Sequence, residues 1–380
     1  MDATSAKLSG WRDKALYTPG PLTTSLTVKQ AMQRDLGSRD TTFIALVQEI
    51  REQLLEIGEV AGKGYETIIV QGSGTFGIEA VLGSVTPPDG HWLVIVNGSY
   101  GRRIVDINRV LGIQTTALEF PENEKPSVAE VAAALDKDPT ITHVAIIHCE
   151  TTTGIINPVE EVGALVRQAK KIYFVDAMSS FGAVTVKPAE WGIDYLVSSA
   201  NKCIEGVPGF SFALARREAL LATRGFARSL SLDLLAQFEG LAANGQFRFT
   251  PPTHALLAFS RALHELREEG GVRGRGARYK RNYEVVAAGM REQGFEEYLR
   301  REDQGYIINS YLYPDHPNFD FETFYKILNE KGFVIYPGKL SAADCFRIGN
   351  IGRLFEADMR GLLGAIRETL AEMKISLTAG

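Results

Sequence analysis

Two residues that can act together in chemistry, Asp176 and Lys202, each follow a short apolar run. Residues 172–175 lead directly into Asp176, and residues 195–197 lead through a polar stretch, 198–201, to Lys202. Ligands of an open α/β sheet collect at the carboxyl ends of the strands, so both side chains are expected to face one pocket. A carboxylate opposite an amine suits pyridoxal phosphate (PLP), whose aldehyde condenses with a lysine and whose ring nitrogen needs an acid partner. Taken singly, the two residues also fit a helix-capping aspartate and a solvated lysine.

A glycine-rich turn, residues 71–75, follows an apolar run and enters a helix-like stretch at 78–82. Such a turn exposes unpaired backbone N–H groups to an anion, and the hydroxyls of Ser73 and Thr75 add further donors. The turn therefore predicts a phosphate cradle, although a plain strand-to-helix connection built of small residues has the same pattern. It lacks the Gly-Lys-Ser/Thr ending of a P-loop and the full spacing of a dinucleotide-binding turn.

Two further polar stretches follow apolar runs. Residues 97–101 place Tyr100 between two glycines, where a planar heteroaromatic ring could stack. Residues 148–154 supply hydroxyls and an acid, a composition that also suits an ordinary loop. Strand ends along the chain thus offer phosphate donors, a stacking ring, hydroxyls, an acid and a lysine, which together favour a PLP enzyme over coincidence.

The elements that must position these residues show in the hydrophobic pattern. Short apolar runs alternate with helical stretches and lie at residues 67–70, 92–96, 144–147, 172–175, 195–197 and 210–215. Near-continuous apolar strands are typical of a parallel sheet covered on both faces by helices. The sequence therefore predicts an α/β fold whose large, mainly parallel sheet domain covers residues 30–261, after an N-terminal segment at 1–29.

The pattern changes after about residue 262. A charged helix at 262–269 and a Gly/Arg-rich turn at 270–278 come first. Alternating strands and helices are then expected, with strands at 306–308, 333–336 and 345–348 and helices at 321–330 and 356–373. This order predicts a smaller α+β C-terminal domain at 262–380, packed closely against the large domain.

The composition narrows the classes of function. The 380 residues carry 41 Lys+Arg against 46 Asp+Glu, a net charge of −5, and no basic stripe with interleaved aromatics, so a nucleic-acid partner is not expected. No apolar run is long enough for a membrane span or a signal peptide, which predicts a cytoplasmic protein. The cysteines, Cys149, Cys203 and Cys345, are odd in number and far apart, which argues against disulfides and a metal site. Cys203 is expected to serve packing.

Several stretches resemble the class-V aminotransferase group of fold-type I PLP enzymes, and the similarity runs through nearly the whole chain. The stretches that carry it are residues 16–23, 37–40, 148–154, 198–203, 207–210 and 346–349. Within the group they are most similar to the branch that transfers the amino group of 2-aminoethylphosphonate to pyruvate. The resemblance implies PLP as cofactor and a homodimer whose active sites are shared between subunits.

The resemblance also implies roles for individual residues. Lys202 would hold the cofactor covalently and shuttle protons, and Asp176 would pair with the ring nitrogen. The remaining cofactor contacts would come from Ser73, Gly74 and Thr75 at the phosphate, Tyr100 at the ring face, Thr152 at the ring hydroxyl and, on the neighbouring subunit's phosphate, Thr250.

The substrate contacts that the resemblance implies are fewer. Arg347 would take the substrate carboxylate, which its planar guanidinium suits. Gly20 in the N-terminal segment would lie at the substrate, and Arg39 would be a second anion contact; Arg39 equally fits an exposed surface position.

Other activities on the same fold stay open at this point. An alanine:glyoxylate or serine:glyoxylate aminotransferase would use the same cofactor chemistry with another amino donor. A cysteine desulfurase or lyase would need a catalytic cysteine on a flexible loop, whereas Cys345 lies in a predicted strand. A protein without catalysis on this fold is expected to lack the lysine or the aspartate, and both are present.

Overall fold

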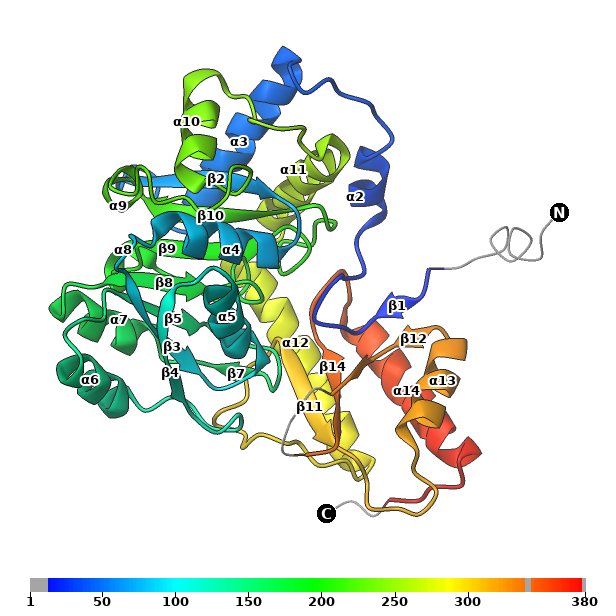
Figure 1. Ribbon diagram of the computed structural model, residues 1–380. Coiled ribbons are helices and arrows are strands. Elements are labelled where there is room, and N and C mark those ends of the chain that lie inside the picture. Colours follow the sequence, from blue (N-terminus) through cyan, green and yellow to red (C-terminus); the bar gives the residue numbers. More distant parts are fainter. Residues whose placement is uncertain (1–12, 339–342, 378–380) are drawn as a thin grey trace.

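A seven-stranded sheet forms the centre of the larger part of the molecule. The computed structural model describes residues 13–338 and 343–377, and the sheet has the strand order β2-β10-β9-β8-β5-β3-β4 (Figure 1). The strands are β2 (Tyr65–Gln71), β3 (His91–Val96), β4 (Gln114–Glu119), β5 (His143–Ile147), β8 (Ile172–Asp176), β9 (Tyr195–Ser199) and β10 (Phe210–Arg216). Strand β10 runs antiparallel to both of its neighbours and the other pairings are parallel, which confirms the predicted mainly parallel α/β fold.

Both faces of this sheet are buried. Successive side chains of a strand point to opposite sides of the sheet, so a buried cluster on each side shows in alternate residues. In β5, Val144 and Ile146 belong to one buried cluster and Ala145 and Ile147 to another. The helices of this part are α3 (Thr41–Ile57), α4 (Gly74–Val85), α5 (Ser99–Val110), α6 (Val128–Lys137), α7 (Val159–Gln168), α8 (Pro188–Trp191), α9 (Arg217–Leu221), α10 (Leu234–Asn244) and α11 (Thr253–Glu268).

Edge strand β4 was not among the predicted strands. Four of its six residues are polar, and its side chains are exposed or half-buried rather than buried. An edge strand with one wet face lacks the continuous apolar run that marked the six others.

The C-terminal part has a second, smaller sheet with the order β11-β14-β13, built from β11 (Ile308–Leu312), β13 (Tyr336–Pro337) and β14 (Cys345–Gly349). Helices α12 (Gly271–Glu292), α13 (Phe321–Glu330) and α14 (Glu356–Glu372) pack with it around a separate apolar cluster. The predicted strand at 333–336 divides into β12 (Phe333–Val334) and β13, and the one at 306–308 begins later, as β11.

The N-terminal segment lies beside this C-terminal part (Figure 1). Strand β1 (Ala15–Leu16) pairs in parallel with β12, and helix α2 (Leu26–Ala31) contacts α11. The N-terminal segment is thereby joined to the C-terminal part. Two short strands near the site, β6 (Cys149–Glu150) and β7 (Ile155–Ile156), complete the elements.

The prediction of a turn at residues 270–278 is wrong, because helix α12 begins at Gly271. The glycines that suggested a turn instead allow close packing: a Cβ on Gly276 would lie 2.3 Å from the carbonyl oxygen of Ala183. Arg275 and Arg278 of the same stretch are buried in ion pairs with Glu205 and Glu269, whereas Arg273 is exposed. Tertiary contacts therefore override the low helix propensity of glycine.

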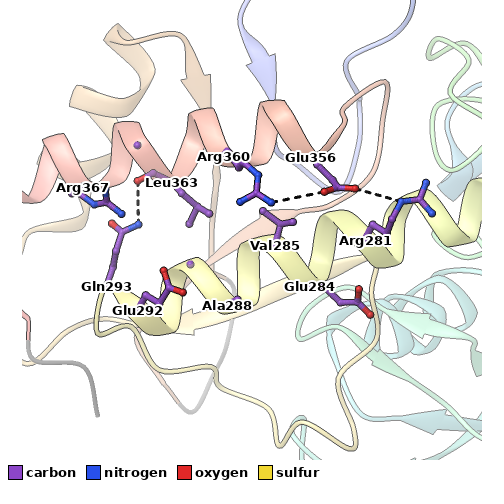
Figure 2. Close-up of a pocket in the computed structure, with 12 residues that line it drawn as sticks. Arg281, Glu284, Val285, Ala288, Glu292, Gln293, Glu356, Arg360, Leu363 and Arg367 are labelled. Carbon is purple, nitrogen blue, oxygen red and sulfur yellow. Dashed lines mark hydrogen bonds and ion pairs between the residues drawn. The ribbon is translucent and has the colours of Figure 1, made fainter.

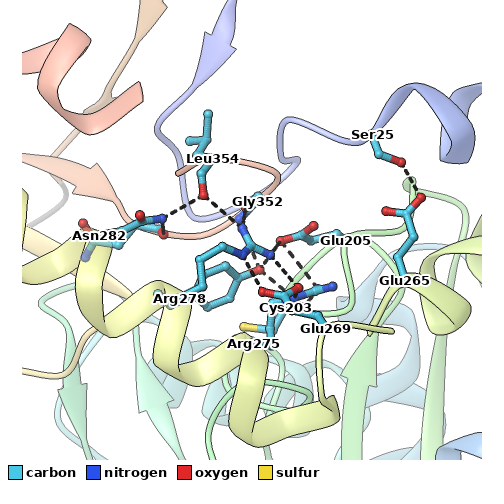
Figure 3. Close-up of polar contacts among 12 residues, drawn as sticks. Ser25, Cys203, Glu205, Glu265, Glu269, Arg275, Arg278, Asn282, Gly352 and Leu354 are labelled. Atoms are coloured by element: carbon cyan, nitrogen blue, oxygen red, sulfur yellow. Dashed lines mark hydrogen bonds and ion pairs between the residues drawn. The ribbon is translucent and has the colours of Figure 1, made fainter. Parts of the chain in front are cut away.

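These arginines form a buried charge cluster with two glutamates (Figure 3). Arg275 Nε and Arg278 Nε lie 2.6 Å from the two carboxylate oxygens of Glu269, and Arg278 Nη2 lies 2.7 Å from Glu205 Oε1. Arg275 Nη1 also donates to the carbonyl oxygen of Cys203 at 2.6 Å. Helix α12 is thus bonded directly to the turn that follows Lys202.

Candidate active site

A cavity of ≈ 180 Å³ lies at the carboxyl ends of β5, β8 and β9. Six residues singled out in the sequence line it together: Ser73, Gly74, Thr75, Tyr100, Asp176 and Lys202. The strands bring these residues to one edge although as many as 129 positions separate Ser73 from Lys202 in the chain. The expected juxtaposition at the strand ends is therefore present.

Asp176 is the last residue of β8 and only 2% exposed. Its Oδ1 accepts a hydrogen bond from the backbone N–H of Met178 at 2.8 Å. Burial raises the pKa of this carboxyl to about 7, and the Met178 bond opposes part of that rise. A buried carboxyl with so high a pKa is in need of a cationic partner, which a protonated ring nitrogen would supply.

Lys202 follows β9 and is half-buried, with its amine enclosed by the N-terminal segment. Its Nζ donates to the carbonyl oxygen of Pro19 at 2.6 Å, and desolvation lowers the pKa of the amine to about 8. Gly20 touches the lysine as well, since a Cβ there would lie 2.6 Å from Nζ and the backbone φ is +124°. Only glycine suits that position, and the predicted substrate residue Gly20 therefore lies directly at the amine of Lys202.

The start of helix α4 lines one end of the cavity. Ser73 is the N-cap residue, and its hydroxyl makes no capping hydrogen bond. Gly74 is packed against Met178, because a Cβ would lie 2.4 Å from the methionine sulfur. The free N-cap hydroxyl, the first-turn N–H groups and the positive end of the helix dipole are together suited to a phosphate.

Tyr100 and Thr152 approach the cavity from neighbouring segments. Tyr100 lies in the first turn of α5 and lines the cavity, with the Arg103 guanidinium 4.8 Å from its ring centre. Thr152 is buried and does not line the cavity, whereas its neighbour Thr151 does. The hydroxyl of Thr152 is engaged by Glu150 at 2.5 Å.

Besides Thr152 and Gly20, three predicted contacts lie outside this lining. Arg347 in β14 is 1% exposed and donates from Nη1 to the carbonyl oxygen of Thr151 at 2.6 Å, so it adjoins the cavity wall. Thr250 is exposed near Gln71, whose amide lies 3.4 Å from the Thr250 carbonyl oxygen. Arg39 is exposed and is not part of the cavity.

The charge of Arg347 lacks an acidic partner among the described residues, in which its hydrogen bonds go to carbonyl oxygens. Besides Thr151, these bonds go to Pro337, at 3.1 Å from Nε and 2.8 Å from Nη2. Burial lowers the pKa of the guanidinium. A buried cation that is held by neutral acceptors favours an anionic ligand nearby.

The cavity is also lined by residues to which the sequence analysis assigned no role in the site. They are Ile78, Arg103, Ile147, Cys149, Thr151, Met178, Ser179, Ser199 and Asn201. Arg103 matters most chemically, since its Nη1 lies 3.5 Å from Thr75 Oγ1 and it forms no ion pair within the described part of the chain. A signal was available: Arg103 lies three positions after Tyr100, on the same face of the helix.

The buried thiols contrast with these polar residues. Cys203 is fully buried, its Sγ lies 3.1 Å from the carbonyl oxygen of Ser179, and burial raises its pKa to about 12. Burial also raises the pKa of Cys149 well above the usual value. Neither thiol has the thiolate character of a nucleophile.

A larger cavity, of ≈ 600 Å³, lies elsewhere, between α12 and α14 (Figure 2). None of the residues predicted for chemistry lines it. Its charged groups are partly paired with one another, as Arg281 and Arg360 both approach Glu356, at 3.6 Å and 3.9 Å. Size alone therefore does not make this groove the reactive site.

Two other classes of feature are absent from the described residues. Across residues 13–338 and 343–377, no helix is long and apolar enough to cross a membrane. The same residues contain no group of three or more His, Cys, Asp or Glu side chains that could hold a metal ion.

Comparisons with known proteins extend these observations. Residues 24–355 match the family model described as aminotransferase class-V. A protein of Salmonella heidelberg named 2-aminoethylphosphonate–pyruvate transaminase is 50% identical over 365 residues, covering 96% of this chain and 99% of the relative. A protein of Syntrophobacter fumaroxidans with the same name is 50% identical over 356 residues, covering 93% and 96%.

Solved structures are similar over nearly the whole chain. The alanine–glyoxylate aminotransferase of a Nostoc species superposes with a TM-score of 0.87 at 26% identity, covering 95% of this chain and 96% of that one. The pyridoxamine–pyruvate aminotransferase of Mesorhizobium loti gives a TM-score of 0.88 at 24% identity, covering 97% and 95%, and supports the fold alone.

Proposed function

The chain belongs to the class-V aminotransferase family, and on that premise we propose that it transfers the amino group of 2-aminoethylphosphonate to pyruvate. The donor carbon is oxidised to the aldehyde of phosphonoacetaldehyde, and the pyruvate carbonyl carbon is reduced to the amine carbon of alanine. The observation that carries the proposal is the pairing of Asp176 and Lys202 in one cavity of a chain that is 50% identical to transaminases of this name.

The residues present fit PLP, the cofactor that the family implies. The cavity offers a free N-cap hydroxyl at Ser73, a buried acid at Asp176, an aromatic ring at Tyr100 and an amine at Lys202. When bound, PLP supplies an electron sink and a carrier for the amino group. Ser73, Gly74 and Thr75 would hold its phosphate, with Arg103 next to them, and Tyr100 would contact its ring.

Two side chains would act on protons. Asp176 would hold the proton of the ring nitrogen, since a cation there stabilises the ionised form of a carboxyl whose pKa burial raises to about 7. Lys202 Nζ would take the proton from the amine-bearing carbon of the donor and give one to C2 of the acceptor. Its lowered pKa, about 8, leaves part of the amine free to act as base near neutral pH.

Arg347 would bind the anion of whichever substrate is present. Among the described residues its guanidinium bonds to carbonyl oxygens and lies 4.8 Å from the Tyr336 ring centre, and it forms no ion pair, so a carboxylate or phosphonate would be its first anionic partner. Gly20 allows the N-terminal segment to approach Lys202 Nζ closely, which would place this segment beside a bound substrate. Arg39 is exposed and is retained only as a second anion contact to be tested.

We further propose a cytoplasmic homodimer. Thr250 is exposed on the described chain, as a residue that reaches a neighbouring subunit's phosphate must be, and closed two-fold pairing is the commonest oligomer. The cysteines of the described residues form no disulfide, which suits a reducing compartment.

A donor screen with pyruvate as acceptor tests the proposal. 2-Aminoethylphosphonate should exceed alanine, serine and taurine in kcat/KM. A preference for glyoxylate with an α-amino acid donor would instead move the chain to the glyoxylate branch and leave the cofactor residues unchanged. The desulfurase alternative has less support, because Cys345 is buried within β14 rather than carried on a loop.

A further inference from the structure

The carboxylate of Glu150 connects two segments that reach the cavity. Glu150 is the last residue of β6 and is completely buried. Its Oε2 accepts hydrogen bonds from the backbone N–H groups of Tyr100 at 3.2 Å and Gly101 at 3.4 Å. Its Oε1 accepts from the N–H of Thr152 at 3.1 Å and from the Thr152 hydroxyl at 2.5 Å.

These bonds complete the start of helix α5. The N-cap residue, Gly98, has no side chain to cap the helix, so the first-turn N–H groups need partners from elsewhere. Thr152 Oγ1 accepts from the backbone N–H of Ser99 at 3.0 Å, and Glu150 Oε2 accepts from the next two N–H groups, those of Tyr100 and Gly101. The first helical bond follows, from Arg102 to the carbonyl oxygen of Gly98. A negative charge at this end also complements the helix dipole.

The fit around Glu150 leaves no spare room. A Cβ on Gly98 would lie 2.3 Å from the carboxylate carbon of Glu150 and 2.7 Å from Oε2. The φ of Gly98 is 171°, an extended value that any residue adopts, so space rather than backbone conformation requires the glycine. The position of the carboxylate is thereby set from both sides, by the hydrogen bonds and by the Gly98 backbone.

From this geometry we propose that Glu150 is the positioning residue of the ring-binding side of the site: one buried carboxylate fixes the Tyr100 ring and the Thr152 segment relative to each other. The proposal rests on the proposed function, because it assumes that Tyr100 contacts a cofactor ring in this cavity. Glu150 does not line the cavity, so it would act through these two residues and not by touching the cofactor.

Glu150→Gln is the informative variant, since glutamine keeps the size but has a single acceptor oxygen. An amide in this place can serve either the N–H groups of α5 or those of Thr152, and it directs its own N–H₂ at the other set. The dissociation constant of PLP, followed by its visible absorption, should rise on the order of 10-fold. The dissociation constant of pyridoxal, which lacks the phosphate, should rise by the same factor, because the substitution changes the contact to the ring.

A double-mutant cycle separates positioning from general destabilisation. If Glu150 acts through the stacking ring, Glu150→Gln should weaken pyridoxal binding much less in a Tyr100→Ala background than in the wild type. Glu265→Gln is the matched control. Glu265 is also a buried carboxylate, it accepts hydroxyl bonds from Ser25 and Thr27, and it lies outside the cavity (Figure 3). Glu265→Gln should lower the melting temperature without changing the affinity for pyridoxal.

The outcomes are distinct. Unchanged binding of pyridoxal by Glu150→Gln, or a full effect that persists in the Tyr100→Ala background, would overturn the role of Glu150. If Glu150→Gln does not fold, Gly98→Ala presses on the same carboxylate and should give the same loss for both ligands; equal affinity in that variant overturns the role too. A wild-type protein that binds neither ligand would instead refute the proposed function, and the role of Glu150 with it.

Discussion

Replacing Asp176 with asparagine should have opposite effects on stability and on catalysis. Burial raises the pKa of Asp176 from 3.8 to about 7, so the folded, cofactor-free protein holds this proton more tightly than the unfolded chain. The wild type therefore loses stability as the pH rises from about 4 to about 7. At about 1.4 kcal/mol per pKa unit, the full cost above pH 7 is roughly 4 kcal/mol.

Asparagine removes that cost and keeps the contact to Met178, because its amide oxygen can accept the same N–H. The free energy of unfolding of the cofactor-free variant should exceed that of the wild type, and the difference should grow by roughly 2 to 3 kcal/mol between pH 5 and pH 8. Urea denaturation at the two pH values measures it. Asp89→Asn, which neutralises an exposed aspartate, controls for the loss of a charge as such.

The same substitution should lower turnover with 2-aminoethylphosphonate and pyruvate on the order of 10²-fold, as expected for the loss of one preorganised charge. The reasoning is refuted if the difference in free energy of unfolding between the variant and the wild type is no larger at pH 8 than at pH 5. It is refuted equally if the half-reaction rates stay near those of the wild type, because the buried charge would then contribute nothing to catalysis.

Four other predictions follow from the same site. Borohydride should fix PLP to a single peptide that contains Lys202, and a Lys202→Ala protein that still carries a reducible cofactor would exclude this lysine. Arg347→Lys should cost roughly 1.5 to 3 kcal/mol in kcat/KM with both pyruvate and 2-aminoethylphosphonate, since it keeps the charge but not the bidentate geometry; an effect on pyruvate alone would require a separate phosphonate site. Arg103→Met should weaken binding of PLP on the order of 10-fold or more and that of pyridoxal little, because the guanidinium lies at Thr75 on the phosphate side; equal losses would assign Arg103 to the ring. Light scattering at assay concentration should show at least a dimer, and an active monomer would remove the proposed role of Thr250.

The sequence was sufficient where one local pattern decides the structure. Buried strands such as β5 and β8 are continuous apolar runs, and the polar residue that ends each one must lie at the sheet edge. Asp176, Lys202 and the turn at Ser73 were therefore found from spacing alone, and the structure places them in one cavity.

The sequence was insufficient where distant segments decide. Residues 270–278 were predicted to form a Gly/Arg-rich turn, but Glu205 and Glu269 pair with Arg275 and Arg278 in the interior, and a helix forms there despite its glycines. The local pattern does not predict partners that lie about 70 positions away, such as Glu205 for Arg278. For the same reason Glu150 read as one polar residue in a loop, although it accepts hydrogen bonds from residues about 50 positions earlier.

The buried charge cluster and the cavity share a boundary at Lys202, which links stability to chemistry. The carbonyl oxygen of Lys202 accepts from the N–H of Glu205 at 2.7 Å, and the next carbonyl, that of Cys203, accepts from Arg275. Arg278 in turn donates from Nη1 to the carbonyl oxygen of Leu354 at 3.0 Å, beyond the strand that carries Arg347. Because both turns are bonded to α12, the lysine and the proposed anion site have one common support. A shift of that helix would change the distance between the reacting carbon and its base, and orientation of this kind is worth several powers of ten in rate.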